Sequence, residues 1–172
     1  ISLELGGKNP NIIFEDADFD KSVNTAVKAG FSNQGQICLC GSRLFIQESI
    51  YERFRDDFVK KTKLLKVGNP KDSTSNLGAI VSKEHLEKIL QCIELAKSEG
   101  GKILIGGNRV ILEGELSKGY YIEPTIIEGL SHLCRTNQEE IFGPVVSIIP
   151  FKEEEEVIEM ANSTKYGLSA SI

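Results

Sequence analysis

Short apolar runs alternate with amphipathic helical patterns along the chain, and this alternation limits the possible folds more than any other feature. The runs cover residues 11–14, 44–46, 103–105 and 145–149. Between and after them, apolar residues recur at helical spacing within 18–31, 49–65, 82–99 and 153–161. A strand that is buried on both faces is a continuous apolar run, and strands that alternate with helices form parallel sheets. We therefore predict an α/β fold with a largely parallel sheet flanked by helices.

Several expected helices have residues suited to their ends. Asp18 is a candidate N-cap, and Ser49 and Glu52 have the spacing of a capping box. The third helix should begin at Ser82, and the glutamates at 153–156 fit the first turn of the last helix. The expected inward residues are Val23, Ala26, Val27, Gly30 and Phe31, then Tyr51, Phe54, Phe58 and Leu65, then Leu86, Ile89, Leu90, Ile93 and Ala96, and finally Val157, Ile158 and Ala161.

The intervening segments are expected to be less regular. Residues 67–82 and 106–119 are rich in glycine and polar residues and are predicted to be loops. A further strand is predicted over 120–127, where Pro124 favours a sheet edge or a bulge.

Composition excludes several classes of protein. The chain has 172 residues, 40% of them hydrophobic, which is enough for one domain with a sizeable core. A net charge of -5 with mixed signs provides no basic stripe, so we do not expect a nucleic-acid partner. Neither a membrane-spanning run nor a signal peptide is recognisable, and the expected compartment is the cytoplasm.

The cysteines and histidines do not have the spacing of a metal site. The four cysteines, at 38, 40, 92 and 134, do not resemble a small disulfide scaffold, and we expect reduced thiols. His85 and His132 are isolated from each other, so no metal is expected.

One thiol lies in a short loop between a helical pattern and a strand pattern. The loop, residues 33–43, has the sequence Asn-Gln-Gly-Gln-Ile-Cys-Leu-Cys-Gly-Ser-Arg and should place Cys38 at the edge of the sheet. A thiolate is a strong nucleophile, and Gly35 and Gly41 let the backbone approach a ligand closely. The alternative is that Cys38 and Cys40 are small buried hydrophobic residues.

Two further stretches make the cysteine loop more specific. Residues 3–10, Leu-Glu-Leu-Gly-Gly-Lys-Asn-Pro, place the carboxylate of Glu4 in an apolar run that ends in paired glycines, and residues 139–144 are Glu-Glu-Ile-Phe-Gly-Pro. In this order and spacing, the three stretches resemble the aldehyde dehydrogenase superfamily, and the resemblance continues to residues 166–170. The sequence of residues 37–43 looks most like that of the branch that acts on muconate semialdehydes.

The resemblance implies that residues 1–172 are a partial aldehyde dehydrogenase catalytic domain, incomplete at both ends. In that family the dinucleotide-binding half lies mostly upstream of the glutamate stretch. No Gly-x-Gly-x-x-Gly motif follows a predicted strand here. These 172 residues alone are therefore expected to be inactive.

The family chemistry assigns roles to two residues. Cys38 would attack the aldehyde, hydride would pass to a nicotinamide, and the resulting thioester would be hydrolysed by water activated by Glu4 as general base. The apolar neighbours Leu3 and Leu5 are expected to surround Glu4 and to raise its affinity for a proton. The backbone N–H of Cys38 would hold part of the oxyanion charge.

The same resemblance implies a cofactor, NAD, with NADP not excluded. Glu140 is similar to the glutamate that binds the nicotinamide-side ribose, and Phe142 to the aromatic residue beside the nicotinamide ring. Leu5 and Gly6 would line the same pocket. For Glu140, a structural role in a turn or helix cap remains the alternative.

Three further residues are considered near the site. His85 and Lys88 fall where family members approach the cofactor ribose, although His85 replaces an expected glutamine. Arg43, which opens a strand, is interpreted as structural.

The leading hypothesis is thus an NAD(P)-dependent aldehyde dehydrogenase with a small aldehyde substrate and homo-oligomeric assembly, a dimer or tetramer. A thiol hydrolase that pairs Cys38 with His85 or His132 is one alternative, and it needs a histidine within hydrogen-bond distance of the sulfur. A non-catalytic, oligomer-forming segment is the other.

Overall fold

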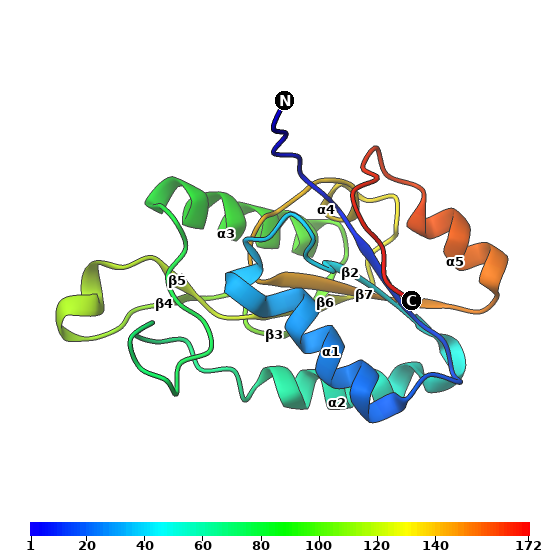
Figure 1. Ribbon diagram of the computed structural model, residues 1–172, viewed down its shortest axis with the longest axis horizontal. Coiled ribbons are helices and arrows are strands. Elements are labelled where there is room, and N and C mark those ends of the chain that lie inside the picture. The colour runs from blue at the N-terminus through cyan, green and yellow to red at the C-terminus, as the bar shows by residue number, and fades with distance from the viewer.

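The computed structural model describes residues 1–172, and its centre is a five-stranded sheet with strand order β1-β2-β7-β6-β3 (Figure 1). The four parallel strands are β1 (Pro10–Ile13), β2 (Arg43–Gln47), β7 (Val145–Phe151) and β6 (Thr125–Glu128). The edge strand β3 (Lys102–Ile105) is antiparallel to β6. The prediction of an α/β fold with a largely parallel sheet is confirmed.

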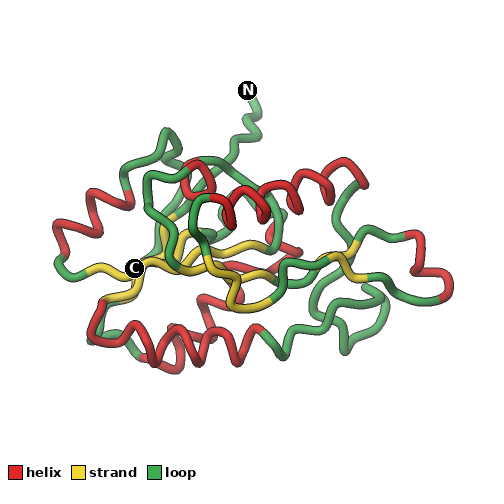
Figure 2. Tube along the Cα trace, turned by 180° about the vertical axis from the view of Figure 1, so that it is seen from behind, coloured by secondary structure: helices red, strands yellow, loops and turns green.

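Helices cover both faces of the sheet, as Figure 2 shows from behind. On one face lie α1 (Phe19–Phe31) and α2 (Tyr51–Thr62), and on the other lie α3 (Lys83–Ser98) and α5 (Glu154–Ala161). Successive residues of a strand point to opposite faces. In β7, Val146 packs in the core that α1 and α2 share with the sheet, whereas Val145 packs in the core beneath α3. This double coverage explains why the strands are continuous apolar runs.

Three of the four predicted helix starts are confirmed, including the glutamate-rich first turn of α5. Asp18 Oδ1 accepts a hydrogen bond from the Lys21 N–H (3.2 Å), and Ser82 Oγ accepts one from the His85 N–H (3.1 Å). The capping box at Ser49 is wrong. A 3₁₀ turn, Glu48–Ile50, precedes α2, and the Ser49 hydroxyl donates to the Glu15 carboxylate (2.6 Å).

The predicted inner faces are buried with few exceptions. Ile158 was expected inside but is 50% exposed, because its neighbour Val157 already occupies the inward position of the short helix α5. Leu65 lies beyond the end of α2, although it still packs against the core. Tyr51, Leu90 and Ala161 are only partly buried.

The strand predicted over 120–127 is in fact two strands that belong to different sheets. Pro124 interrupts it, since proline has no N–H to donate to a strand neighbour. Before the interruption, β5 (Tyr121–Ile122) pairs with β4 (Arg109–Val110) inside the segment predicted to be a loop. After it, the Thr125 N–H donates to the Pro144 carbonyl (2.8 Å) and begins β6.

Three short helical segments were not predicted: the 3₁₀ turns Ser32–Gly35 and Gly114–Lys118, and the single-turn helix α4 (Arg135–Gln138). They are shorter than the repeat that an apolar helical pattern needs to be recognised. None of the helices has the length and apolar character needed to cross a bilayer.

Candidate active site

The three stretches that resemble the family, residues 3–10, 33–43 and 139–144, are called the signature stretches. They lie at the end of the sheet where the strands β1, β2 and β7 begin. Gly6 and Gly7 precede β1, Cys38 precedes β2, and the turn at 140–143 precedes β7. These strands are parallel neighbours, with Pro10 opposite Arg43 and Arg43 opposite Ser147. Segments that precede parallel neighbouring strands must meet at the same edge of a sheet. The candidate site is therefore built on the amino ends of the strands.

The paired glycines bring the other two stretches together. The Gly7 N–H donates to Glu140 Oε1 (3.0 Å), and a Cβ on Gly6 would overlap the same carboxylate. A Cβ on Gly7 would lie 2.6 Å from the Cys38 carbonyl oxygen. Only residues without side chains allow this approach. The backbone of Gly6 and Gly7 thus lies directly between the cysteine loop and the Glu140 carboxylate.

The backbone ahead of Cys38 adopts an unusual left-handed turn. Asn33, Gln34 and Gly35 have φ angles of 48°, 57° and 68°. For residues other than glycine this conformation costs roughly 1–2 kcal/mol each. Gln34 offsets part of the cost, because its Oε1 accepts from the Gly78 N–H (2.9 Å) and its Nε2 donates to the Ala79 carbonyl (3.3 Å). A Cβ on Gly35 would overlap the Gly143 carbonyl, so this turn also packs on the turn that carries Phe142.

Sequence reasoning did not single out Gln34, which anchors the cysteine loop to residues 78–79. Within a loop, a glutamine whose amide binds backbone groups more than forty residues away has no local pattern. The only signal was the run Asn-Gln-Gly, whose residue types favour positive φ at its first and last positions.

The two cysteines of the loop have different environments. Cys40 is buried, its thiol donates to the Gly30 carbonyl (3.2 Å), and burial raises the pKa of Cys40 to about 11. Cys40 is therefore the small buried residue that the alternative interpretation described. Cys38 is only half-buried, and no hydrogen bond holds its sulfur. Of the two thiols, Cys38 is the one that a substrate can reach.

Glu4 and Leu5 lie in an extended segment that projects from the sheet at the chain's N-terminal end (Figure 1). The expected apolar surroundings of Glu4 are wrong for this structure, since Leu3 is 69% and Leu5 56% exposed. No other element packs over residues 1–5, and no hydrogen bond links Glu4 to Cys38. The structure thus brings Gly6, Cys38 and the 140–142 turn together and leaves Glu4 and Leu5 in solvent.

The turn that carries Glu140 and Phe142 is held by α3. Phe142 has a left-handed φ of 59°. The His85 ring contacts the Phe142 carbonyl through Nε2 (2.6 Å), and Lys88 Nζ donates to the Glu140 carbonyl (3.3 Å). His85 and Lys88 therefore lie beside the turn that carries Glu140 and Phe142, and they contact its backbone.

The Glu140 carboxylate is chemically suited to a ribose. Its Oε1 accepts the Gly7 N–H, its Oε2 has no hydrogen bond, and the side chain is half-buried. A carboxylate with free lone pairs accepts hydrogen bonds from vicinal hydroxyls. The residues present thus fit the nicotinamide-side ribose of a dinucleotide.

Arg43 is structural, as predicted. It is fully buried, and its guanidinium donates to the carbonyl oxygens of Lys8 (2.8 Å), Met160 (2.9 Å) and Ala161 (2.8 Å). Burial lowers the pKa of Arg43 to about 10. Its donors are occupied by the backbone, so Arg43 ties the start of β2 to the end of α5.

Lys8 is a buried cation without a hydrogen-bonded partner. It is 2% exposed, and burial together with the charge of Arg43 lowers the pKa of Lys8 from 10.5 to about 8. The folded state therefore binds the Lys8 proton less tightly than the unfolded state does. Below pH 8 both states are charged, and the full cost of burying the charge is present.

Replacing Lys8 with methionine is expected to stabilise the protein near neutral pH by about 3 kcal/mol, since each pKa unit corresponds to roughly 1.4 kcal/mol. Between pH 8 and 10.5 the folded state loses this proton before the unfolded state does. The difference in stability between the variant and the parent protein therefore becomes smaller as the pH rises. Urea unfolding of both proteins near neutral pH and near pH 10.5 measures the difference. Because the charge of Lys8 lowers the pKa of Cys40, both proteins carry Cys40→Ala, which removes the Cys40 titration from the comparison. An advantage that does not change with pH would contradict the burial cost.

Neither histidine is placed for a thiol hydrolase. The Nε2 of His85 contacts the Phe142 carbonyl, and no hydrogen bond joins the His132 ring to Cys38. No group of three or more His, Cys, Asp or Glu side chains is arranged around a possible metal position.

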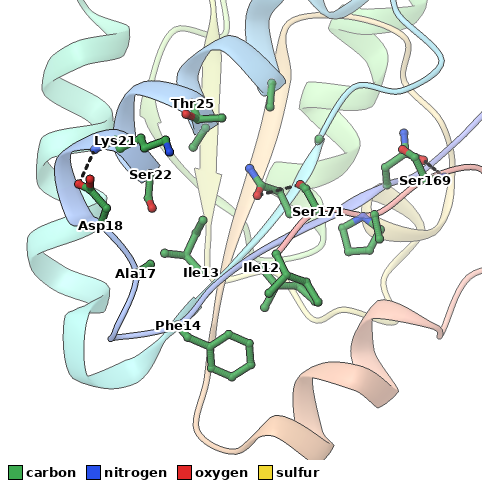
Figure 3. Close-up of a pocket in the computed structure, with 18 of the residues that line it drawn as sticks. Ile12, Ile13, Phe14, Ala17, Asp18, Lys21, Ser22, Thr25, Ser169 and Ser171 are labelled. Carbon is green, nitrogen blue, oxygen red and sulfur yellow. Dashed lines mark hydrogen bonds between the residues drawn. The ribbon is translucent and has the colours of Figure 1, made fainter.

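A cavity of about 720 Å³ lies beside the outer edge of β1, where Ser171 forms a parallel bridge with Asn11 (Figure 3). Ser22 and Thr25 of α1, Ile13 of β1 and Ser171 line it. It reaches Leu39 at one end, but Cys38, Glu4 and Glu140 are not among its lining residues. The cavity therefore borders the cysteine loop through Asn9, Leu39 and Gly41 but does not contain the candidate catalytic side chains.

Comparison with known proteins agrees with the geometry. The model of the Aldehyde dehydrogenase family matches residues 1–172. The chain belongs to the aldehyde dehydrogenase family. The 2-aminomuconic semialdehyde dehydrogenase of Danio rerio is 48% identical over 174 residues, which cover all of this chain and 36% of that protein. Aldehyde dehydrogenase B of Escherichia coli (strain K12) is 49% identical over 178 residues, which cover 34% of that protein.

Solved aldehyde dehydrogenases share the fold. The betaine aldehyde dehydrogenase of Staphylococcus aureus in complex with NAD+ superposes with a TM-score of 0.93 at 42% identity, covering 97% of this chain and 33% of that one. A mutant of the P. syringae indole-3-acetaldehyde dehydrogenase in complex with NAD+ and IAA gives 0.92 at 39% identity, with 97% and 33% covered. The chain spans about a third of the length of the curated relatives it matches.

Proposed function

We propose that these residues belong to an NAD-dependent enzyme that oxidises an aldehyde to a carboxylic acid, with Cys38 as the nucleophile. The observation that carries the proposal is that three segments meet at Gly6 and Gly7. The Cys38 carbonyl and the Glu140 carboxylate both approach the backbone of these two glycines. A reachable thiol and a carboxylate that fits a ribose thus lie at the same edge of the sheet.

The reaction begins when the Cys38 thiolate adds to the aldehyde carbon. A carbon–sulfur bond forms, and the carbonyl oxygen becomes an oxyanion that the Cys38 N–H stabilises in part. Loss of hydride from the same carbon restores the carbonyl group and leaves a thioester on Cys38. Water then attacks the thioester while Glu4 accepts its proton, the carbon–sulfur bond breaks, and the carboxylic acid leaves. No hydrogen bond fixes residues 1–5, so Glu4 is free to approach the thioester.

NAD is the proposed cofactor, with NADP as the second candidate. Glu140 would accept hydrogen bonds from the nicotinamide-side ribose, Phe142 would lie beside the ring, and Leu5 and Gly6 would line the same pocket. When bound, the nicotinamide accepts the hydride. The solved relatives in complex with NAD+ support this choice.

A muconate-type semialdehyde is the proposed substrate class. The sequence of residues 37–43 and the 48% identity to a 2-aminomuconic semialdehyde dehydrogenase support it. Since a bacterial aldehyde dehydrogenase is 49% identical, simple aliphatic aldehydes must be compared directly. Homo-oligomeric assembly remains a prediction from the family resemblance, and a cytoplasmic location remains a prediction from the sequence.

The function is tested in a polypeptide of the relatives' length that contains these 172 residues, called the full-length enzyme below. We expect it to reduce NAD in the presence of an aldehyde, as followed by the absorbance of reduced nicotinamide. A higher kcat/KM for a muconate-type semialdehyde than for aliphatic aldehydes would support the substrate class. Absence of aldehyde-dependent NAD reduction with every aldehyde would overturn the function.

The 172 residues alone are expected to bind NAD only weakly, with a Kd in the millimolar range or about −4 kcal/mol. Glu140 and Phe142 contact one end of the dinucleotide, whereas phosphates are usually held by a glycine-rich turn and a helix N-terminus that this sheet edge lacks. The same chain is expected not to oxidise aldehydes. Calorimetric titration of the purified chain measures the affinity, and a micromolar Kd would show that the cofactor site is misplaced.

A further inference from the structure

We infer that Asn9 is a positioning residue for the Cys38 nucleophile, an inference that rests on the function proposed above. Asn9 is 3% exposed and lies five residues after Glu4. Its side-chain Nδ2 donates to the Cys38 carbonyl (2.7 Å) and to the Cys40 carbonyl (3.0 Å). One amide group therefore holds the backbone on both sides of Leu39.

These two hydrogen bonds fix the orientation of the nucleophile's backbone. A peptide group is planar, so holding the Cys38 carbonyl fixes the plane that follows Cys38 and restricts its ψ angle. Side-chain packing cannot do this, because Leu39 is 60% and Ile37 36% exposed. The direction of the Cys38 side chain relative to the approaching carbonyl carbon therefore depends on the Asn9 amide.

Asn9 also connects the cysteine loop to two other parts of the chain. Its Oδ1 accepts the Ser169 N–H (3.2 Å), the contact drawn beside Ser169 in Figure 3, and its backbone carbonyl accepts the Arg43 N–H (3.3 Å). Both N–H groups of the amide and its oxygen are thus used. Loss of the donor would leave two carbonyls without their partner, since a buried acceptor keeps its desolvation cost.

A purely structural asparagine provides the matched control. Asn11 is in β1 two residues further on, is also buried (6% exposed), and its Oδ1 accepts the Ser171 hydroxyl (3.0 Å). No hydrogen bond joins the Asn11 side chain to residues 38–40. Changing either asparagine to aspartate introduces the same group, at Asn9 just before β1 and at Asn11 within it, but only the Asn9 change removes the donor to the cysteine loop.

The test is the burst of reduced nicotinamide in the full-length enzyme at saturating aldehyde and NAD. The burst amplitude counts folded sites that can be acylated, and its rate constant reports how well each site is arranged. We expect Asn9→Asp to lower the rate constant about tenfold to a hundredfold, as loss of two hydrogen bonds permits. Asn11→Asp should leave the rate constant near that of the unmodified enzyme. A structural role alone would lower the amplitude and leave the rate constant unchanged, and that result would overturn the inference.

A second variant covers the case in which Asn9→Asp does not fold. Asn9→Ser keeps a neutral donor that can reach at most one carbonyl, and it should lower the rate constant while KM for NAD stays the same. An unchanged rate constant in Asn9→Ser would also overturn the inference. If the unmodified enzyme gives no burst, the proposed function fails. A normal burst in the unmodified enzyme with no slowing in the Asn9 variants contradicts only the role of Asn9.

Discussion

Replacing Cys38 with alanine in the full-length enzyme is expected to lower aldehyde oxidation by at least roughly 10⁴-fold, the order found when a covalent nucleophile is removed. Without the thiol there is no adduct from which hydride can leave. Covalent labelling of the site by a thiol reagent should be lost with it, because Cys38 is the half-buried thiol of the loop and its sulfur has no hydrogen bond. Steady-state kinetics and mass spectrometry of the labelled protein measure the two effects.

Cys40→Ala is the matched control, since the two thiols are two residues apart in one loop. The pKa of Cys40, raised to about 11 by burial, keeps its thiol protonated at neutral pH, and the thiol already donates to the Gly30 carbonyl. This variant should lose some stability and keep most of its turnover. Substantial dehydrogenase activity in the Cys38→Ala protein would end the assignment of the nucleophile.

The sequence was sufficient to predict the elements whose apolar pattern is long. The inward residues of α1 repeat over more than two turns, and all of those predicted are buried. Asp18 and Ser82 were recognisable as helix starts because a cap depends on residues only three positions apart. Ser49 had the same local spacing, but its hydroxyl bonds to Glu15 from a different part of the chain. A long-range contact of this kind has no local signal.

The candidate site shows the same limit. Each signature stretch was visible in the sequence, and the family resemblance grouped Cys38 with Glu140. That both precede parallel neighbouring strands depends on the order β1-β2-β7, in which β7 joins the sheet from about a hundred residues away. Strand order is a property of the packed sheet, so residue patterns could not show that the site lies at the amino ends of the strands.

The surroundings of Glu4 were predicted incorrectly for a physical reason. An apolar run such as Leu3-Glu4-Leu5 usually indicates burial, but burial needs another element to pack against the run. In this structure β1 begins only at Pro10, and residues 1–5 extend into solvent. The Gly6–Gly7 pair fixes where this extended segment leaves the sheet, because its backbone lies between the Glu140 carboxylate and the Cys38 carbonyl.

Removing the Glu4 carboxylate should impair a different step from the one that Cys38 performs. Glutamine has nearly the same shape but cannot accept the proton of water, so Glu4→Gln should still form the thioester and release reduced nicotinamide in a burst. Hydrolysis should then become rate-limiting, and steady turnover should fall by roughly 10²–10⁴-fold, the usual contribution of a general base. A pre-steady-state trace of the full-length enzyme records both phases in one measurement.

The burst separates a general base from a residue that only shapes the pocket. If Glu4 merely helped to bind substrate or cofactor, Glu4→Gln would slow the burst and the steady phase together, because both depend on the same bound complex. Glu15→Gln serves as the control, since Glu15 is an exposed carboxylate at the opposite end of β1. It should change neither phase. A strong added nucleophile such as hydroxylamine can attack the thioester without a base, so it should restore turnover in Glu4→Gln but not in Cys38→Ala. A Glu4→Gln enzyme with no burst and unimpaired steady turnover would contradict the role assigned to Glu4.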